Sequence, residues 1–166
     1  ALIMPLAACE GQLPTPAADS STKVAPDLTE AQEKKIRTKI LETIDQADAA
    51  RSADGYQSVM GGPQLEIRTS QATIAQKSGS MSKYATIPKD IAQVVIPTDD
   101  GWPRSVFTIT TTTEDQQSKR LLVLNQESAR QNYKLMAMAR LFEGAQLPKF
   151  EVPTIEGGKT KVRVPE

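Results

Sequence analysis

The sequence contains no histidine, only one cysteine, few aromatic residues and no excess of charge of either sign. Without histidine the chain cannot build a Ser-His-Asp triad or a histidine-ligated zinc site. One cysteine supplies neither an internal disulfide nor a thiolate zinc site. The 20 lysine and arginine residues balance 20 aspartate and glutamate residues, so charge gives no reason to expect nucleic acid as a partner. We therefore expect one domain plus a tail, with no metal and no cofactor.

The single cysteine follows a short apolar segment, and its surroundings predict lipidation. Leu6-Ala7-Ala8-Cys9 resembles the lipobox of bacterial lipoproteins, where small residues fit the peptidase and the cysteine sulfur receives the lipid. Residues 10–27 hold three prolines among small and polar residues, a composition typical of a solvated tether. A free core cysteine or a short apolar strand is the alternative, which this tether disfavours.

From this pattern we expect residues 1–8 to be the end of a lipoprotein signal peptide and residues 9–27 to be the lipidated Cys9 with its tether. Two or three acyl chains are enough for stable anchoring. No later apolar run approaches the ~18 residues of a membrane span, so the expected anchor is lipid. The expected location is the extracytoplasmic face of the cell membrane.

The folded part begins with the pattern of an amphipathic helix. Thr29 and Gln32 have the spacing of a capping box, and Leu28 precedes them. Apolar residues then recur at helical spacing, which predicts a helix over residues 30–51 with its charged residues, Arg37 among them, largely on the solvent side. One apolar face requires a partner surface, which we expect to be a sheet.

After this helix the sequence predicts a short helix over residues 56–60 and another helix from Pro63 to about Gln76, although alternation at residues 65–67 also fits the start of a strand. From Asp90 onward the apolar period is two. Strands are expected over residues 91–96, 106–113 and 120–126, followed by a strand from Tyr133 in which Tyr133, Leu135, Ala137, Ala139 and Leu141 share one face.

Helices followed by strands with short connections predict an α+β domain over residues 28–147, with a long N-terminal helix packed on an antiparallel meander. Residues 148–166 contain three prolines and a Gly-Gly pair, and they show no clear pattern of a helix or strand. We expect them to be a linker or the start of a further region.

Several stretches resemble a known family. The element order resembles the nuclear-transport-factor-2-like (cystatin-like) architecture, which implies a curved sheet around the long helix and a conical pocket. Residues 61–68, 100–104, 122–130 and 133–135 are similar to stretches of a family of actinobacterial membrane-anchored lipoproteins of unknown function. The resemblance implies a location and a fold, and it transfers no catalytic residue.

Motifs for specific chemistry are weak. Ser80-Met81-Ser82-Lys83 has the S-x-x-K form of penicillin-binding enzymes, but no K-T-G motif follows it. Asp99 and Asp100 fit paired carboxylates, yet Asp-Asp-Gly is more typical of a turn. The threonine-rich run over residues 108–113 suits a solvated sheet face or an edge open to another chain.

Polar and aromatic residues in the family-like stretches are the candidates for a pocket or partner surface: Arg68, Trp102, Arg104, Glu127 and Arg130. Trp102 beside Arg104 fits a stacking or anion site, or else Trp102 closes one end of the core and Arg104 is solvated. The arginines and Glu127 fit a pocket lining, and they fit a structural Arg–Glu pair better.

We expect a non-catalytic binding or assembly module with an envelope protein as partner. The alternatives are a small-ligand carrier, or an enzyme using Asp and Arg groups in the conical pocket.

Overall fold

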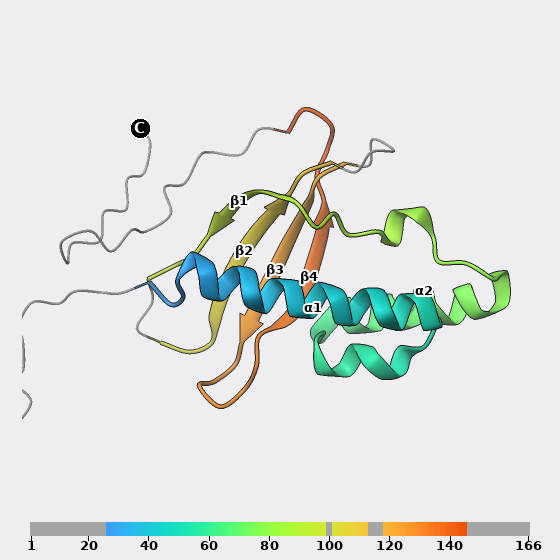
Figure 1. Ribbon diagram of the computed structural model, residues 1–166, viewed down its shortest axis with the longest axis horizontal. Coiled ribbons are helices and arrows are strands. Elements are labelled where there is room, and N and C mark those ends of the chain that lie inside the picture. Colours follow the sequence, from blue (N-terminus) through green and yellow to red (C-terminus); the bar gives the residue numbers. More distant parts are fainter. Residues whose placement is uncertain (1–25, 99–100, 113–117, 146–166) are drawn as a thin grey trace, which may run out of the picture.

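Two helices precede a four-stranded antiparallel sheet along the chain (Figure 1). The computed structural model describes residues 26–98, 101–112 and 118–145. The predicted α+β class is confirmed, because the helices pack against a sheet that does not close into a barrel. The elements are α1 (Glu30–Ala50), η1 (Ala53–Ser58), α2 (Gly62–Ser78), η2 (Lys83–Ala85), β1 (Ile91–Val95), β2 (Arg104–Thr110), β3 (Arg120–Gln126) and β4 (Lys134–Arg140).

Helix α1 begins and ends where its sequence provides partners for the free backbone groups. The Thr29 hydroxyl accepts a hydrogen bond from the Gln32 amide at 3.2 Å, and the Gln32 side chain accepts one from the Thr29 amide at 2.9 Å. This is the predicted capping box. At the other end Arg51 has a left-handed backbone with φ of 52°, and its N–H returns to Ala47 and Asp48 carbonyls. The predicted helix is therefore confirmed to within one residue.

The second helical region differs from the sequence prediction in detail. The strand alternative for residues 65–67 is wrong, since they lie inside α2, which starts with Gly62 and Pro63. The expected helix at residues 56–60 is a 3-10 helix shifted toward the N-terminus, because the Ser52 hydroxyl caps it by accepting from the Asp54 amide. Met60 instead forms a parallel bridge with Leu135 of β4.

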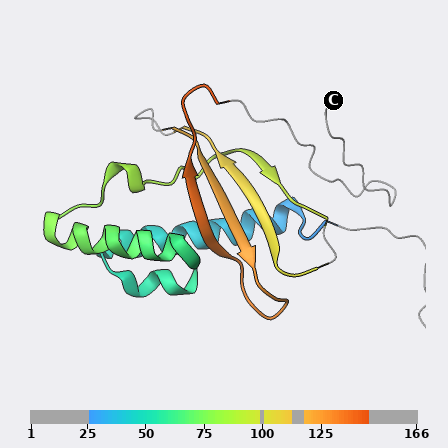
Figure 2. The same cartoon turned by 180° about the vertical axis from the view of Figure 1, so that it is seen from behind.

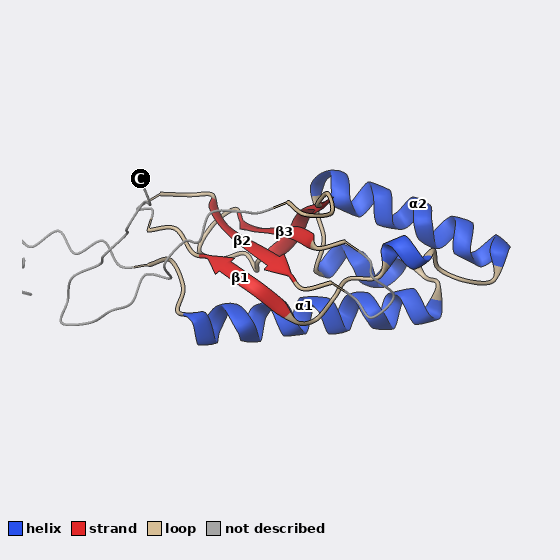
Figure 3. Cartoon of the chain, turned by 90° about the horizontal axis from the view of Figure 1, so that it is seen from above, coloured by secondary structure: helices blue, strands red, loops and turns tan. Residues whose placement is uncertain are grey.

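The sheet follows the order β1-β2-β3-β4, so the predicted antiparallel meander is confirmed. Residues directly opposite one another point to the same face. One row of partners is Val94–Thr108–Leu122–Met138, and the neighbouring row is Val95–Phe107–Val123–Ala137. Helix α1 covers the face of the first row, which we call the inner face (Figure 3). No helix of the described residues lies over the second, outer face (Figure 2).

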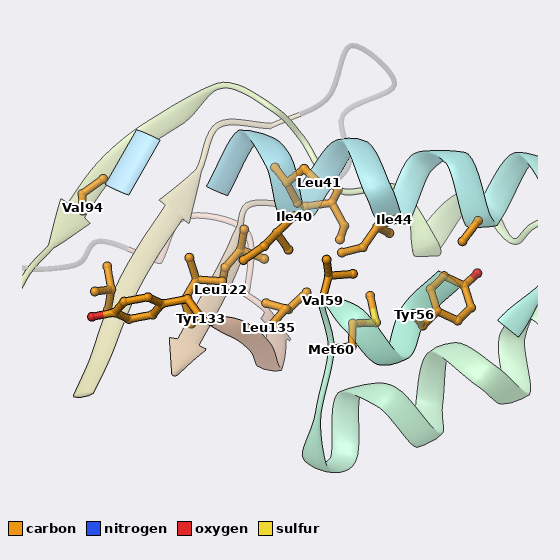
Figure 4. Packing of buried hydrophobic residues seen from close by; sticks show 14 of the residues in the cluster. Ile40, Leu41, Ile44, Tyr56, Val59, Met60, Val94, Leu122, Tyr133 and Leu135 are labelled. Carbon is orange, nitrogen blue, oxygen red and sulfur yellow. The ribbon is translucent and has the colours of Figure 1, made fainter. Parts of the chain in front are cut away.

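The core lies between α1 and the inner face. Side chains of Ile40, Leu41 and Ile44 on α1 point toward Leu122 and Leu135 of the sheet (Figure 4). Tyr56, Val59 and Met60 extend this cluster beneath the C-terminal half of α1. In the described part of the chain, side chains therefore fill the space where the resemblance implied a conical pocket.

Two predictions about solvent-facing polar residues are wrong. Arg37 is only 5% exposed, because Glu33 one turn earlier holds its guanidinium at 2.8 Å. Thr108 and Thr110 are fully buried rather than on a solvated face. The Thr108 hydroxyl donates to Glu33 at 3.2 Å, and the Thr110 hydroxyl accepts from the Arg120 amide at 2.9 Å. Hydrogen bonds among these polar groups offset the free energy lost when they leave water.

The predicted common face of the last strand is also wrong. The pairing of β3 with β4 shifts between Val123 and Leu124, so that one extra residue enters β4. Such a bulge reverses the alternation of side chains beyond it. Leu135 is therefore buried and Met138 packs against the core, whereas Ala137 and Ala139 are exposed on the outer face.

Several predicted features lie outside the described residues: Cys9 and the segment 1–25, the Asp99-Asp100 turn, and the segment 148–166.

Candidate functional site

Arg68 lies in a buried polar cluster between α1 and α2. Its side chain is 1% exposed, its Nε donates to Asp48 at 3.0 Å, and a terminal nitrogen makes a close ion pair with the other oxygen of that carboxylate. The second terminal nitrogen donates to the Ala85 carbonyl at 2.6 Å. Tyr56 donates to the same carboxylate at 2.6 Å, and burial together with this hydrogen bond raises the pKa of Tyr56. Arg68 thus ties two helices together, and its partner is Asp48 rather than Glu127.

A polar hollow of about 470 Å³ borders this cluster. Ser80, Ser82 and Lys83 of the S-x-x-K motif line it together with Asp45 and Arg51, among others. The Ser82 hydroxyl accepts from the Tyr84 amide at 3.3 Å and so caps η2. The motif therefore occupies a loop and the start of a single 3-10 turn, whereas the penicillin-binding enzymes place their serine at the start of a long helix.

Trp102 and Arg104 stack on each other at the start of β2. The guanidinium carbon lies 4.4 Å from the centre of the indole, which is a cation–π contact. Trp102 is 41% exposed and therefore does not close the core. The Arg104 Nε also lies 3.5 Å from a carboxylate oxygen of Asp27, whose side chain is fully buried.

Tyr133, just before β4, lies at the same corner of the sheet. It is 5% exposed, and in the described part of the chain its hydroxyl has no hydrogen-bond partner. Burial raises its pKa, and the charge of Asp27 raises it further. The Asp27 amide donates to the Pro97 carbonyl at 3.1 Å, which fixes the entry of the chain at the end of β1. The corner thus joins Asp27, Trp102, Arg104 and Tyr133.

Glu127 and Arg130 lie in the turn between β3 and β4, and both are exposed. With Asn125, Lys134 and other residues they line a shallow hollow of about 440 Å³. Within the described residues neither forms an ion pair, so the predicted structural Arg–Glu pair is absent there.

The five predicted residues are therefore divided among three places and do not form one pocket. The described residues also contain no group of three or more carboxylate or cysteine ligands for a metal ion. None of their helices combines the length and the apolar character that crossing a membrane requires.

The outer face of the sheet is a feature that sequence reasoning missed. Its two complete rows are Val95–Phe107–Val123–Ala137 and Gln93–Ile109–Leu121–Ala139. Seven of these eight residues are apolar. The available signal was the continuous apolar run Leu121-Leu122-Val123-Leu124, since a strand apolar on both faces predicts cover on both faces.

Comparisons with known proteins give a family without an assigned activity. No curated protein and no solved structure matches the chain. A family model described as "Domain of unknown function (DUF8094)" matches residues 24–153, which include all the described elements. The chain belongs to this family.

Proposed function

We propose that the chain is a cell-envelope lipoprotein whose α+β domain is a non-catalytic binding and assembly module. Lipid on Cys9 holds it at the extracytoplasmic face of the membrane, and the tether that follows Cys9 carries the domain away from the surface. The observation that carries the proposal is the apolar outer face of a sheet that α1 covers on one side only.

The outer face has the chemistry of a protein contact. Phe107, Leu121 and Val123 are half-buried, Ile109 is buried, and Ala137 and Ala139 are exposed. Two rows across four strands give an apolar strip about 15 Å wide, at roughly 4.8 Å between strands. Contiguous apolar surface of this kind marks protein interaction sites more often than single exposed residues do.

Small-ligand carriage and catalysis in a conical pocket have less support. Side chains of α1 and the inner face fill the space between them in the described residues. The carboxylates found there are paired with arginine: Glu33 with Arg37, and Asp48 with Arg68. A small ligand needs a concave cavity, whereas the outer face offers a surface crossing the whole sheet. An envelope protein that packs a helix or a sheet on this face is therefore the proposed partner.

The anchoring part is tested with Cys9→Ala in the full precursor, expressed in the native host. Loss of the acyl acceptor is expected to move the protein from the membrane fraction to the soluble fraction. Unchanged membrane retention contradicts the lipid anchor.

The binding part is tested by quantitative capture of tagged protein from native membranes. Val123→Lys places a charge in the middle of the outer face, and Thr38→Lys places the same charge on the exposed side of α1 as a matched control. We expect one partner near one-to-one with the wild type and the control, and its loss with Val123→Lys. Equal recovery with both variants, in protein that remains folded, contradicts the outer face as the contact surface.

A further inference from the structure

A second, differently built surface lies where β3 begins and β4 ends. Here η2 approaches the sheet, and a groove of about 980 Å³ opens between them. Tyr84 lines one wall, and Lys119, Arg140, Phe142 and Glu143 line the other parts. None of these residues belongs to the outer-face rows, so the groove and the outer face are separate surfaces.

Among the described residues, positive charges outnumber negative ones at this groove, although the chain as a whole is neutral. Lys119 and Arg140 line the groove, and Lys83 lies beside it over the Tyr84 ring. None of the three forms an ion pair within the described residues. Glu143 is the one carboxylate among the described lining residues.

Aromatic surface accompanies these cations. Tyr84 is 51% exposed, and the centre of its ring lies 5.0 Å from the Arg140 guanidinium carbon and 5.2 Å from the Lys83 ammonium. Phe142, two residues beyond the end of β4, is 91% exposed. Covering these rings with apolar parts of a ligand would be favourable, while the cations would pair with its negative groups.

The groove also adjoins an edge of β4 that is paired over only part of its length within the described residues. The first half of β4 is paired along its edge away from β3. There the Leu135 amide donates to the Val59 carbonyl at 2.8 Å, and the Gly61 amide donates to the Leu135 carbonyl at 3.1 Å. Among the described strands none continues this pairing toward Arg140, since β4 is the last strand of the sheet. An unpaired edge is a template for an extended peptide.

We propose that this groove binds an extended acidic segment of a protein partner, with apolar side chains against Tyr84 and Phe142. The segment would add to the edge of β4 and place its carboxylates near Lys119 and Arg140. An anionic membrane surface would satisfy the charge, but the cations line a hollow beside a strand edge, which fits a chain better than a flat lipid interface. The inference rests on the proposed function as a binding module and names the chemistry of one partner segment.

Fluorescence anisotropy on the purified 166-residue chain tests the proposal. The probe is a labelled twelve-residue peptide that repeats Glu-Thr-Glu-Val, and the reference probe carries Lys in place of Glu. We expect the acidic peptide to bind at least about tenfold more tightly at low salt and to weaken as salt rises. The basic peptide binding equally well overturns the proposal.

Matched variants locate the site. Lys119→Gln with Arg140→Gln is expected to weaken binding of the acidic peptide at least about tenfold. Lys34→Gln with Lys35→Gln removes the same charge from the exposed side of α1 and is expected to leave affinity within about twofold. Phe142→Ser is expected to weaken binding about threefold. Phe142 is almost fully exposed, so this substitution is not expected to affect folding. Equal affinity of the two double variants overturns the groove as the site.

Vesicles of phosphatidylglycerol distinguish the lipid alternative. One set of results would identify the groove as a membrane contact and overturn the peptide proposal. In that set the wild type binds the vesicles, the variant Lys119→Gln with Arg140→Gln does not bind them, and the acidic peptide does not bind the wild type. The proposed function as a binding module is tested separately, by capture from native membranes. If the partner is lost with Val123→Lys but kept with Lys119→Gln and Arg140→Gln, the binding module is supported and the groove is overturned as the site of the acidic segment.

Discussion

The two faces of the sheet differ in a way that burial alone would not predict. The inner face, packed under α1, carries Thr108 and Thr110 with no exposed surface. The outer face, which no described helix covers, is apolar in nearly every position of two complete rows. Polarity along a strand therefore does not by itself tell which face is buried.

What decides burial is the chemistry that the opposing element supplies. Helix α1 places Glu33 over β2, where one carboxylate oxygen accepts from both Arg37 and Thr108. The Arg37 guanidinium also donates to the Lys89 carbonyl at 3.3 Å. Because these groups are partners for one another, the inner face can hold them without a large desolvation penalty.

The largest expected effect comes from breaking this buried pair. Glu33→Leu leaves the Arg37 guanidinium buried without its carboxylate and the Thr108 hydroxyl without its acceptor. We expect the free energy of unfolding to fall by about 3–5 kcal/mol, measured by urea denaturation.

The double variant Glu33→Leu with Arg37→Met separates charge pairing from packing. Removal of both charges together is expected to recover most of the lost stability, since a well-packed apolar pair often equals a buried ion pair. A single variant no less stable than the wild type would show that Arg37 finds another partner or water.

The next largest change in the free energy of unfolding is expected from a comparison of two adjacent residues of β3 that point to opposite faces. Leu122 is fully buried on the inner face, whereas Val123 is half-buried on the outer face. Leu122→Ala is expected to cost about 2–5 kcal/mol through a cavity in the core, and Val123→Ala less than about 1 kcal/mol. Urea denaturation of the two purified variants measures both values.

A large cost for Val123→Ala in the isolated chain would mean that its own residues already cover the outer face. That result would remove the surface on which the proposed function depends. A small cost, together with weakened partner capture, would support the contrast between the faces.

Local signals in the sequence predicted the elements well. The capping box at Thr29 and Gln32, the spacing of the α1 isoleucines and the alternation in β3 each depend on residues a few positions apart. These short-range patterns gave the α+β order and the meander. They failed where a distant partner decides: Arg37 and Thr108 are buried because Glu33 lies between them, 75 residues before Thr108 in the chain.

The candidate site was less predictable for the same reason. Arg68 was selected as a pocket residue, but its partner Asp48 comes from another helix, and no local spacing links them. The stack of Trp102 on Arg104 was one of two alternatives, and a local pattern offered it because the two residues are two positions apart. The cationic groove was missed because a net charge of zero averages over clusters that only the fold brings together.

The smallest expected effect is a loss of stability at alkaline pH, caused by a tyrosine buried beneath α1. Tyr56, beneath α1, has a raised pKa because it is buried and donates to Asp48, with the Arg68 charge opposing that shift. Below pH 10 both the folded and the unfolded chain keep this proton. Above the ordinary tyrosine pKa near 10 the unfolded chain releases it first, so the free energy of unfolding falls with rising pH, by about 1 kcal/mol at about pH 10.7. Tyr133, whose pKa is also raised, adds to the loss, as does Lys89, whose pKa is raised by Asp45.

Comparison with Tyr56→Phe isolates the contribution of Tyr56, because Tyr133 and Lys89 are present in both proteins. The variant lacks the hydrogen bond to Asp48 and is expected to be less stable by about 1–2 kcal/mol at pH 8. Its stability should then fall less steeply than that of the wild type between about pH 9 and about pH 11, as measured by urea denaturation at each pH. Parallel curves for the two proteins would mean that Tyr56 titrates alike in the folded and unfolded chains, and that the inner layer does not keep this hydroxyl from solvent.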